Sequence, residues 1–198
     1  AARPSKSTTN SCIAATTPHG RLEVHVIDVG QGDAIFIKSP DGKTALIDAG
    51  NNGKGDDVAT YLQSLGVSSI DFVIASHYHA DHIGGLDEVM DIISVGQVLD
   101  RGGSYSSLTF DDYVAAAGAR RAVIGGSIDL GPSVNAQVLQ KDVGIGENDK
   151  SIVLKISFGE LDMIFGGDCE TVCEENLNPG DLEFYKVQAI ICRTYALA

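Results

Sequence analysis

One stretch of sequence decides how this chain folds: Ser76-His77-Tyr78-His79-Ala80-Asp81-His82-Ile83-Gly84-Gly85. It follows an apolar segment, residues 70–75, that is typical of a buried strand. Three of the chain's five histidines and one carboxylate therefore lie within six residues at a strand end. Neutral imidazoles and carboxylates suit zinc and its neighbours, so the stretch predicts a metal site. The alternative is a solvated polar loop with incidental histidines, and the clustering makes that the weaker interpretation.

Composition and charge set the outer limits. The chain has 198 residues, 43% hydrophobic and 21% charged, which suits one globular domain with a sizeable core. Residues 1–20, rich in Ser, Thr, Ala and Pro, predict a flexible N-terminal extension before a folded domain over residues 21–198. No apolar run is long enough to predict a membrane segment. The formal net charge of -13 argues against broad electrostatic attraction to nucleic acid, which is bound through Lys and Arg.

Hydrophobic periodicity predicts an α/β chain in which strands come first, helices follow, and more strands return. The predicted strands are residues 22–26, 34–38, 44–47, 70–75, 97–99, 151–156, 161–165 and 184–192, with two or three short ones between 122 and 139. Helices are predicted near residues 86–93, 110–117 and 169–177, and after Asp56 or Asp57, which are expected to cap the first. The apolar residues of that first helix, Val58, Tyr61, Leu62 and Leu65, are expected in the core. A hairpin ends at Gly166-Gly167-Asp168, so a second carboxylate can reach the histidine site.

Other polar residues are expected at the surface. Arg101, Arg120 and Arg121 are interpreted as solvated charges, with contact to a phosphate-bearing substrate as the alternative. His25 alternates outward on its strand, and residues 141–150 predict a mobile loop because they combine Gly with Asp.

The four cysteines are Cys12, Cys169, Cys173 and Cys192, and they include no C-x-x-C pair. A structural zinc site built on cysteine is therefore not expected. Their even number permits disulfides, and with the Ser/Thr-rich start it favours an extracellular or secreted protein over a cytoplasmic one.

The motifs together resemble the metallo-β-lactamase superfamily. His77-x-His79-x-Asp81-His82 is similar to its metal motif, and Gly167-Asp168 is similar to the strand end that supplies its bridging aspartate. Residues 27–34 and 46–50, and Asn148 with Ser151 ahead of a strand, resemble the hydrolase domain of competence ComEC-type DNA-uptake proteins.

This resemblance implies an αβ/βα four-layer sandwich and two divalent metal ions, zinc first, with manganese or iron as alternatives. It implies that His77 and His79 bind one ion, that Asp81 and His82 bind the other, and that Asp168 bridges both. Asp81 is also the expected catalytic residue, orienting a metal-bound hydroxide. Asp28, Asp33 and Asp48 are expected to orient the ligands, and for each of them local turn capping is nearly as good an interpretation.

The implied function is a metal-dependent phosphodiesterase or nuclease whose substrate is DNA or a small phosphodiester. Another ester or a lactam stays open, because the acidic balance disfavours tight binding of nucleic acid. The chain departs from the family at Gln188-Ala189-Ile190-Ile191-Cys192, where a further histidine ligand is expected, and no histidine follows His82. The fold is therefore expected to lack its last elements, and a catalytically impaired metal-binding remnant is the alternative function.

Overall fold

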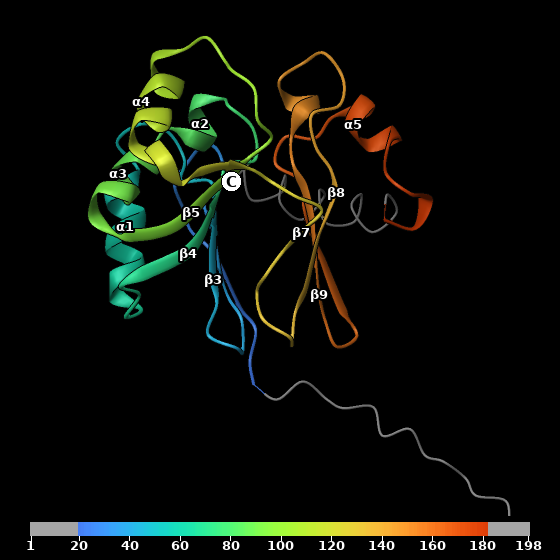
Figure 1. Cartoon of the computed structure of the whole chain (residues 1–198), viewed down its shortest axis with the longest axis horizontal. Helices are drawn as coiled ribbons and strands as arrows, with labels where there is room; N and C mark the ends of the chain where they lie inside the picture. Colours follow the sequence, from blue (N-terminus) through green and yellow to red (C-terminus); the bar gives the residue numbers. More distant parts are fainter. Residues whose placement is uncertain (1–19, 182–198) are drawn as a thin grey trace, which may run out of the picture.

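The computed structural model describes residues 20–181, in which two β-sheets pack face to face with helices on their outer sides (Figure 1). The first sheet has the order β1-β2-β3-β4-β5-β6 and the second the order β10-β9-β8-β7. The first sheet contains β1 (Glu23–Val26), β2 (Ile35–Lys38), β3 (Thr44–Ile47), β4 (Ser69–Ile74), β5 (Ser94–Asp100) and β6 (Arg121–Val123). The second contains β7 (Ser127–Ile128), β8 (Asn135–Gln140), β9 (Val153–Phe158) and β10 (Leu161–Phe165).

Helices cover the outer face of each sheet in Figure 1. They are α1 (Gly55–Ser64), α2 (Ala80–Ile83), α3 (Leu86–Ile92), α4 (Leu108–Ala117) and α5 (Thr171–Glu175), with 3-10 turns at η1 (Gly118–Arg120) and η2 (Asn148–Lys150). Within residues 20–181, no helix combines the length and apolar character that crossing a membrane requires.

The first sheet changes direction at β3, and this change positions the site. Strands β1, β2 and β3 form an antiparallel meander, whereas β3, β4, β5 and β6 are parallel. Parallel strands need crossover connections, and α1, α3 and α4 lie in these connections. The chain therefore leaves β3, β4 and β5 at the same edge of the sheet, and polar residues that follow these strands meet there.

Three apolar layers hold the sandwich together. One packs α1, α3 and α4 against the first sheet through residues such as Leu62, Leu86 and Tyr113. The second lies between the sheets and joins Ile47, Ile74 and Leu99 to Leu154 and Ile156. The third packs α5 on the outer face of the second sheet and includes the disulfide between Cys169 and Cys173. The predicted αβ/βα four-layer fold is confirmed.

The first helix differs from its prediction at both ends. Its N-cap residue is Lys54, with no side-chain cap, so the expectation of an Asp56 or Asp57 cap is wrong. Glu88 of α3 replaces that cap, because its carboxylate accepts hydrogen bonds of 2.7 Å from the backbone N–H groups of Gly53 and Gly55.

Tyr61 and Leu65 are 38% and 40% exposed, so only Val58 and Leu62 of the predicted apolar face are fully in the core. The helix meets the sheet along a narrower stripe than four apolar positions require. Val26 is likewise 76% exposed, although strand alternation placed it inward. The predicted strand 184–192 lies outside the described residues, and so does the N-terminal extension apart from Gly20.

Asp71 of β4 ties two strands of the first sheet together. Its carboxylate accepts hydrogen bonds from Lys43 Nζ, Thr44 N and Thr44 Oγ1 at 2.9, 2.9 and 3.0 Å. Burial alone would raise the pKa of Asp71, but the bonds from Lys43 and Thr44 outweigh it, and the pKa lies below its ordinary value of 3.8. The carboxylate is therefore ionised and bonded at neutral pH.

Replacing Asp71 by alanine is expected to lower the free energy of unfolding by about 1–3 kcal/mol in urea denaturation at pH 7. A carboxyl group whose pKa is lowered by folding stabilises the protein above its unfolded pKa and loses this effect as pH falls through the folded pKa. The difference between wild type and variant should therefore shrink below about pH 4. Asp112→Ala, at an exposed position of α4, is the control and should change stability by less than about 0.5 kcal/mol. Equal effects of both variants would contradict the role given to Asp71.

Candidate metal centre

Two sheets contribute to the candidate site. Asp48 follows β3, and the stretch from Ser76 to His82 follows β4, so both leave the shared edge of the first sheet. Asp168 follows β10 of the second sheet. The close approach of the two sheets requires Gly167, which has a φ of 51° and whose added Cβ would lie 2.8 Å from Ser76 Oγ.

The Asp48 carboxylate is the centre of the hydrogen bonding. This residue is 0% exposed, and its Oδ1 accepts a hydrogen bond of 2.8 Å from the Ser76 N–H. Its Oδ2 accepts from Ser76 Oγ at 2.6 Å and pairs with His82 Nδ1 at 2.8 Å. A buried carboxylate needs such partners, because an unpaired charge in the interior is strongly unfavourable.

These bonds fix the proton positions on two imidazoles. Ser76 has one hydroxyl proton and donates it to Asp48, so its oxygen accepts from His77 Nδ1, which lies 3.0 Å away. His82 Nδ1 likewise donates to Asp48. His77 and His82 therefore both turn their Nε2 atoms toward the site. Carboxylates that bond to the other ring nitrogen impose this orientation on metal-binding histidines.

The distances between candidate ligand atoms fit a tetrahedral metal. His77 Nε2 lies 3.1 Å from His79 Nδ1, and His82 Nε2 lies 3.4 Å from Asp168 Oδ1. Two ligands at about 2.0–2.1 Å from one zinc ion in tetrahedral geometry are about 3.3–3.4 Å apart. Ligand atoms of His77, His82 and Asp168 all lie within 4.8 Å of one another, so the two pairs adjoin. The donor set therefore fits divalent metal.

Burial and these contacts shift the pKa values of four groups of the site. Burial, followed by the charge of His82, lowers the pKa of His77 to about 4, so its imidazole is neutral at pH 7. Burial opposes protonation of His82, but hydrogen bonds to Asp168 and Asp48 outweigh it and raise its pKa to about 11. The same bond from His82 lowers the pKa of Asp168. Burial, then the charge of Asp48, raises the pKa of Asp33 to about 6.

The other residues that the sequence predicted for the site lie in different surroundings. Neither His79 nor Asp81 joins the ligand atoms of either candidate cluster of the described residues. His79 contacts the site through His77, and the Asp81 Oδ2 accepts a hydrogen bond of 2.9 Å from Gln31 Nε2. Asp33 lies with Asp48 and His82 in the second cluster, with ligand atoms within 4.8 Å. Asp28 is exposed and its carboxylate accepts from the Gly30 N–H at 3.0 Å, which is the local turn capping that the sequence left open.

Sequence reasoning missed three neighbours of the site. Ser76 had a usable signal, since it is the polar residue between the buried strand and His77. Gln31 lies in a Gly-Gln-Gly turn, where no hydrophobic periodicity indicates which way its side chain points. Gly32 has a φ of 89°, and an added Cβ would lie 1.6 Å from the Asp81 carbonyl oxygen, so this loop packs directly on the histidine loop. His25 lies apart from the site, where its Nδ1 is 2.9 Å from the Tyr61 hydroxyl.

The family model of the metallo-beta-lactamase superfamily matches residues 27–188, which includes every residue of the candidate site. The chain belongs to this superfamily. Members of the metallo-beta-lactamase superfamily are metal-dependent hydrolases, and the donor set described above is consistent with that class.

Two curated proteins show sequence similarity to this member of the superfamily. ComE operon protein 3 of Bacillus subtilis (strain 168) is 26% identical over 179 residues, which cover 78% of this chain and 23% of that protein. Competence protein ComA of Neisseria gonorrhoeae is 27% identical over 164 residues, which cover 81% of this chain and 22% of that protein. The chain thus spans less than a quarter of the length of these relatives.

Solved structures show the same fold at low sequence identity. A metallo-beta-lactamase of Cronobacter sakazakii with a HARLDQ motif has a TM-score of 0.55 at 16% identity, covering 75% of this chain and 60% of that chain. A subclass B3 metallo-beta-lactamase from a soil metagenome library has a TM-score of 0.52 at 17% identity, covering 73% and 58%. These likenesses concern the fold alone.

Ser76→Ala should change the tautomer of His77 in chelator-treated protein. Without the hydroxyl oxygen, His77 Nδ1 loses its acceptor, and we expect the fraction protonated at Nδ1 to fall. Nitrogen-15 NMR of the ring distinguishes the two nitrogens. Ser69→Ala, an exposed position at the start of β4, is the control and should leave the His77 signals unchanged. Identical His77 spectra in wild type and Ser76→Ala would contradict the assigned hydrogen bonding.

Proposed function

We propose that this chain is a metal-dependent phosphodiesterase that hydrolyses DNA or a smaller phosphodiester at the candidate metal centre. One observation carries this proposal: ligand atoms of His77, His82 and Asp168 converge within 4.8 Å from two different sheets. Such convergence of imidazole and carboxylate groups is typical of a catalytic metal site rather than of a solvated loop.

The proposed ligands form two groups that share one carboxylate. His77 and His79 bind one divalent ion, Asp81 and His82 bind the second, and Asp168 bridges both. The position of Asp168 supports its role, since it is 3.4 Å from His82 and adjoins His77. The proposed role of Asp81 requires its carboxylate to turn from Gln31, its present partner, toward His82.

Metal ions bound there would activate water and polarise the substrate oxygens. The protein's own groups orient the ligands. Asp48 holds His82 directly and holds His77 through Ser76, and we propose that Asp33 supports the same cluster. Zinc suits this donor set, with manganese or iron as alternatives. Asp81 is the proposed catalytic carboxylate, which would orient the attacking water and help to pass on its proton once it has turned from Gln31.

The phosphodiester class rests on the similarity to the two competence proteins. A hollow of about 800 Å³ is lined by the loop that joins β5 to α4 and by the start of α4, and the ring centre of Tyr105 in its lining is 6.0 Å from that of His79. We propose that substrate approaches the centre from this side. The net charge of -13 favours transient contact with DNA over tight binding, and it keeps a smaller phosphodiester, another ester or a lactam as competing substrates. The disulfide Cys169–Cys173 supports an extracellular location.

Hydrolysis of bis-p-nitrophenyl phosphate and of single-stranded DNA tests the proposal, with zinc or manganese added to chelator-treated protein. We expect metal-dependent turnover that His77→Ala and Asp168→Ala each lower by more than about 100-fold, because loss of a residue that only supports a ligand already lowers activity by about 10–100-fold. Metal analysis should find about two ions per chain.

His25→Ala is the matched control, since this histidine lies outside the candidate site, and it should retain full activity. Turnover that survives Asp168→Ala would reject the assigned centre. Tightly bound metal without turnover of either phosphodiester would instead favour the impaired remnant, or a lactam or ester substrate, which hydrolysis of a chromogenic cephalosporin and of p-nitrophenyl acetate would then separate.

A further inference from the structure

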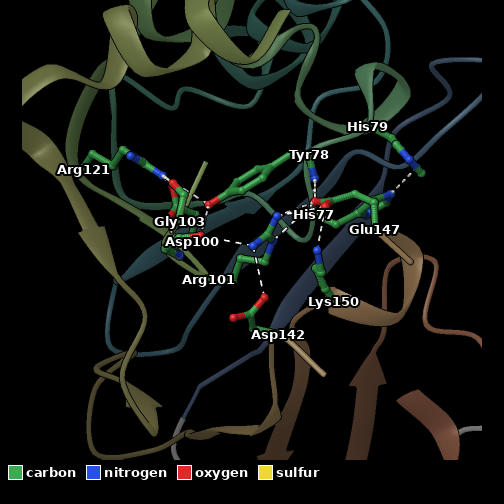
Figure 2. A network of polar contacts seen from close by, with 11 residues as sticks. His77, Tyr78, His79, Asp100, Arg101, Gly103, Arg121, Asp142, Glu147 and Lys150 are labelled. Atoms are coloured by element: carbon green, nitrogen blue, oxygen red, sulfur yellow. Dashed lines mark hydrogen bonds and ion pairs between the residues drawn. The ribbon is translucent and has the colours of Figure 1, made fainter. Parts of the chain in front are cut away.

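A glutamate from the connection between β8 and β9 holds the backbone of the histidine motif. Glu147 Oε1 accepts a hydrogen bond of 2.9 Å from the N–H of Tyr78, the residue between His77 and His79 (Figure 2). The peptide groups on either side of Tyr78 set the spacing of the two imidazoles. The acceptor over this N–H is therefore in a position to control how His77 and His79 face each other.

Arg101 holds Glu147 in place. Its Nη2 donates to Oε1 and Oε2 of Glu147 at 3.0 and 2.8 Å, and the side chains of the pair are only 5% and 7% exposed. The Arg101 guanidinium also lies 4.2 Å from the centre of the Tyr78 ring. The two charges compensate each other inside the protein, because a buried charge without its partner is strongly destabilising. Arg101 is thus not the solvated surface charge that its sequence context predicted.

The far end of Tyr78 is fixed as well. Its hydroxyl donates to the Gly102 carbonyl oxygen at 2.9 Å and accepts from Arg121 Nη2 at 3.2 Å. Arg121 in turn donates to Asp100 at 2.6 Å. Figure 2 shows Arg121 and Asp100 near the hydroxyl end of Tyr78 and Glu147 at its backbone. Tyr78 is therefore held by hydrogen bonds at both ends, and the bond at its backbone is the one next to the imidazoles.

Glu147 also links the histidines to the part of the chain that carries Asp168. It lies in the connection between β8 and β9, where a mobile loop was expected, but its side chain is almost fully buried. Its neighbour Asp149 accepts a hydrogen bond of 3.1 Å from the Cys173 N–H, and Asn148 Nδ2 donates to Glu170 at 2.8 Å. The segment 147–149 thus contacts Tyr78 on one side and the chain that follows Asp168 on the other.

We propose that Glu147 is a positioning residue of the metal centre, whose carboxylate holds the Tyr78 peptide so that His77 and His79 keep their metal-binding spacing of 3.1 Å and His77 stays beside Asp168. The inference rests on the proposed function, since it assigns these side chains as metal ligands. Arg101 serves it by compensating the charge of Glu147. The decisive chemical feature is an oxygen acceptor over the Tyr78 N–H, not the negative charge itself.

Two double variants separate the acceptor from the ion pair. Arg101→Met with Glu147→Gln removes both charges but retains a side-chain oxygen over the Tyr78 N–H. Arg101→Met with Glu147→Ala removes the charges and the acceptor. Neither leaves a buried unpaired charge, so urea unfolding should show whether both fold. Asp142→Asn alters an exposed partner of the same arginine, 3.1 Å from Nη1, and is the control.

Zinc affinity of the full chain, measured by competition with a chromophoric chelator, is the first readout. We expect the glutamine double variant and Asp142→Asn to bind zinc within about threefold of wild type, and the alanine double variant to bind about 10–100-fold more weakly. The two double variants should resist urea equally, yet only the glutamine variant should bind zinc as wild type does. A merely structural role of the ion pair would not produce this difference in zinc affinity. Equal zinc affinity of the two double variants would overturn the proposal.

Hydrogen exchange and ring NMR of chelator-treated protein provide a second readout that needs no metal. The Tyr78 amide should exchange faster, and the nitrogen-15 signals of His77 and His79 should shift, in the alanine double variant but not in the glutamine one. If wild type binds no zinc, manganese or iron, the proposed function fails. The positioning role is then supported by this difference and overturned if the two double variants give the same exchange and spectra.

Discussion

The buried carboxylate of Asp48 is the constraint on which the site depends. It lies at 0% exposure, and its oxygens are bonded to Ser76 N, Ser76 Oγ and His82 Nδ1. Because Ser76 uses its only proton on Asp48, the orientation of His77 follows from the same carboxylate. One aspartate therefore sets the proton positions of two imidazoles. Its backbone φ of 59° is one that aspartate tolerates better than most residues, and it turns the chain sharply at the end of β3.

The elements and the motif could be predicted because their signals are local. Strand alternation, helix spacing and the turn at Gly166–Gly167 are read within short windows, and His77, His79 and His82 are recognisable from their clustering. The partners that organise them are tertiary. Arg101 and Glu147 are 46 residues apart, and nothing near either residue indicates that they pair. For the same reason Asp28 and Asp48, both at strand ends, could not be told apart until one proved exposed and the other buried.

Predictions from local sequence were wrong where a side chain of another element supplied the hydrogen-bond partner. Asp56 and Asp57 are suitable caps for α1, yet Glu88 of α3 takes that role from outside the helix. Residues 141–150 have the composition of a mobile loop, but Glu147 within them is buried by Arg101. In both cases a carboxylate accepts hydrogen bonds from the backbone N–H groups of a different element. Composition does not show which residue supplies such an acceptor.

The division of the site between two sheets explains why polar contacts are needed where the sheets meet. The apolar layer between them is held by the hydrophobic effect, which has no direction and tolerates small sliding of one sheet on the other. Ligand geometry does not tolerate such sliding, since the ligand atoms of His77, His82 and Asp168 lie within 4.8 Å of one another and metal–ligand bonds have narrow length ranges. Among the directional bonds that cross between the connections of the two sheets at this edge are Ile152 N–H to the Ser76 carbonyl oxygen at 2.9 Å, and Tyr78 N–H to Glu147 at 2.9 Å. They bracket His77 on both sides, so the register of the two sheets is fixed at the residue where an error would matter most.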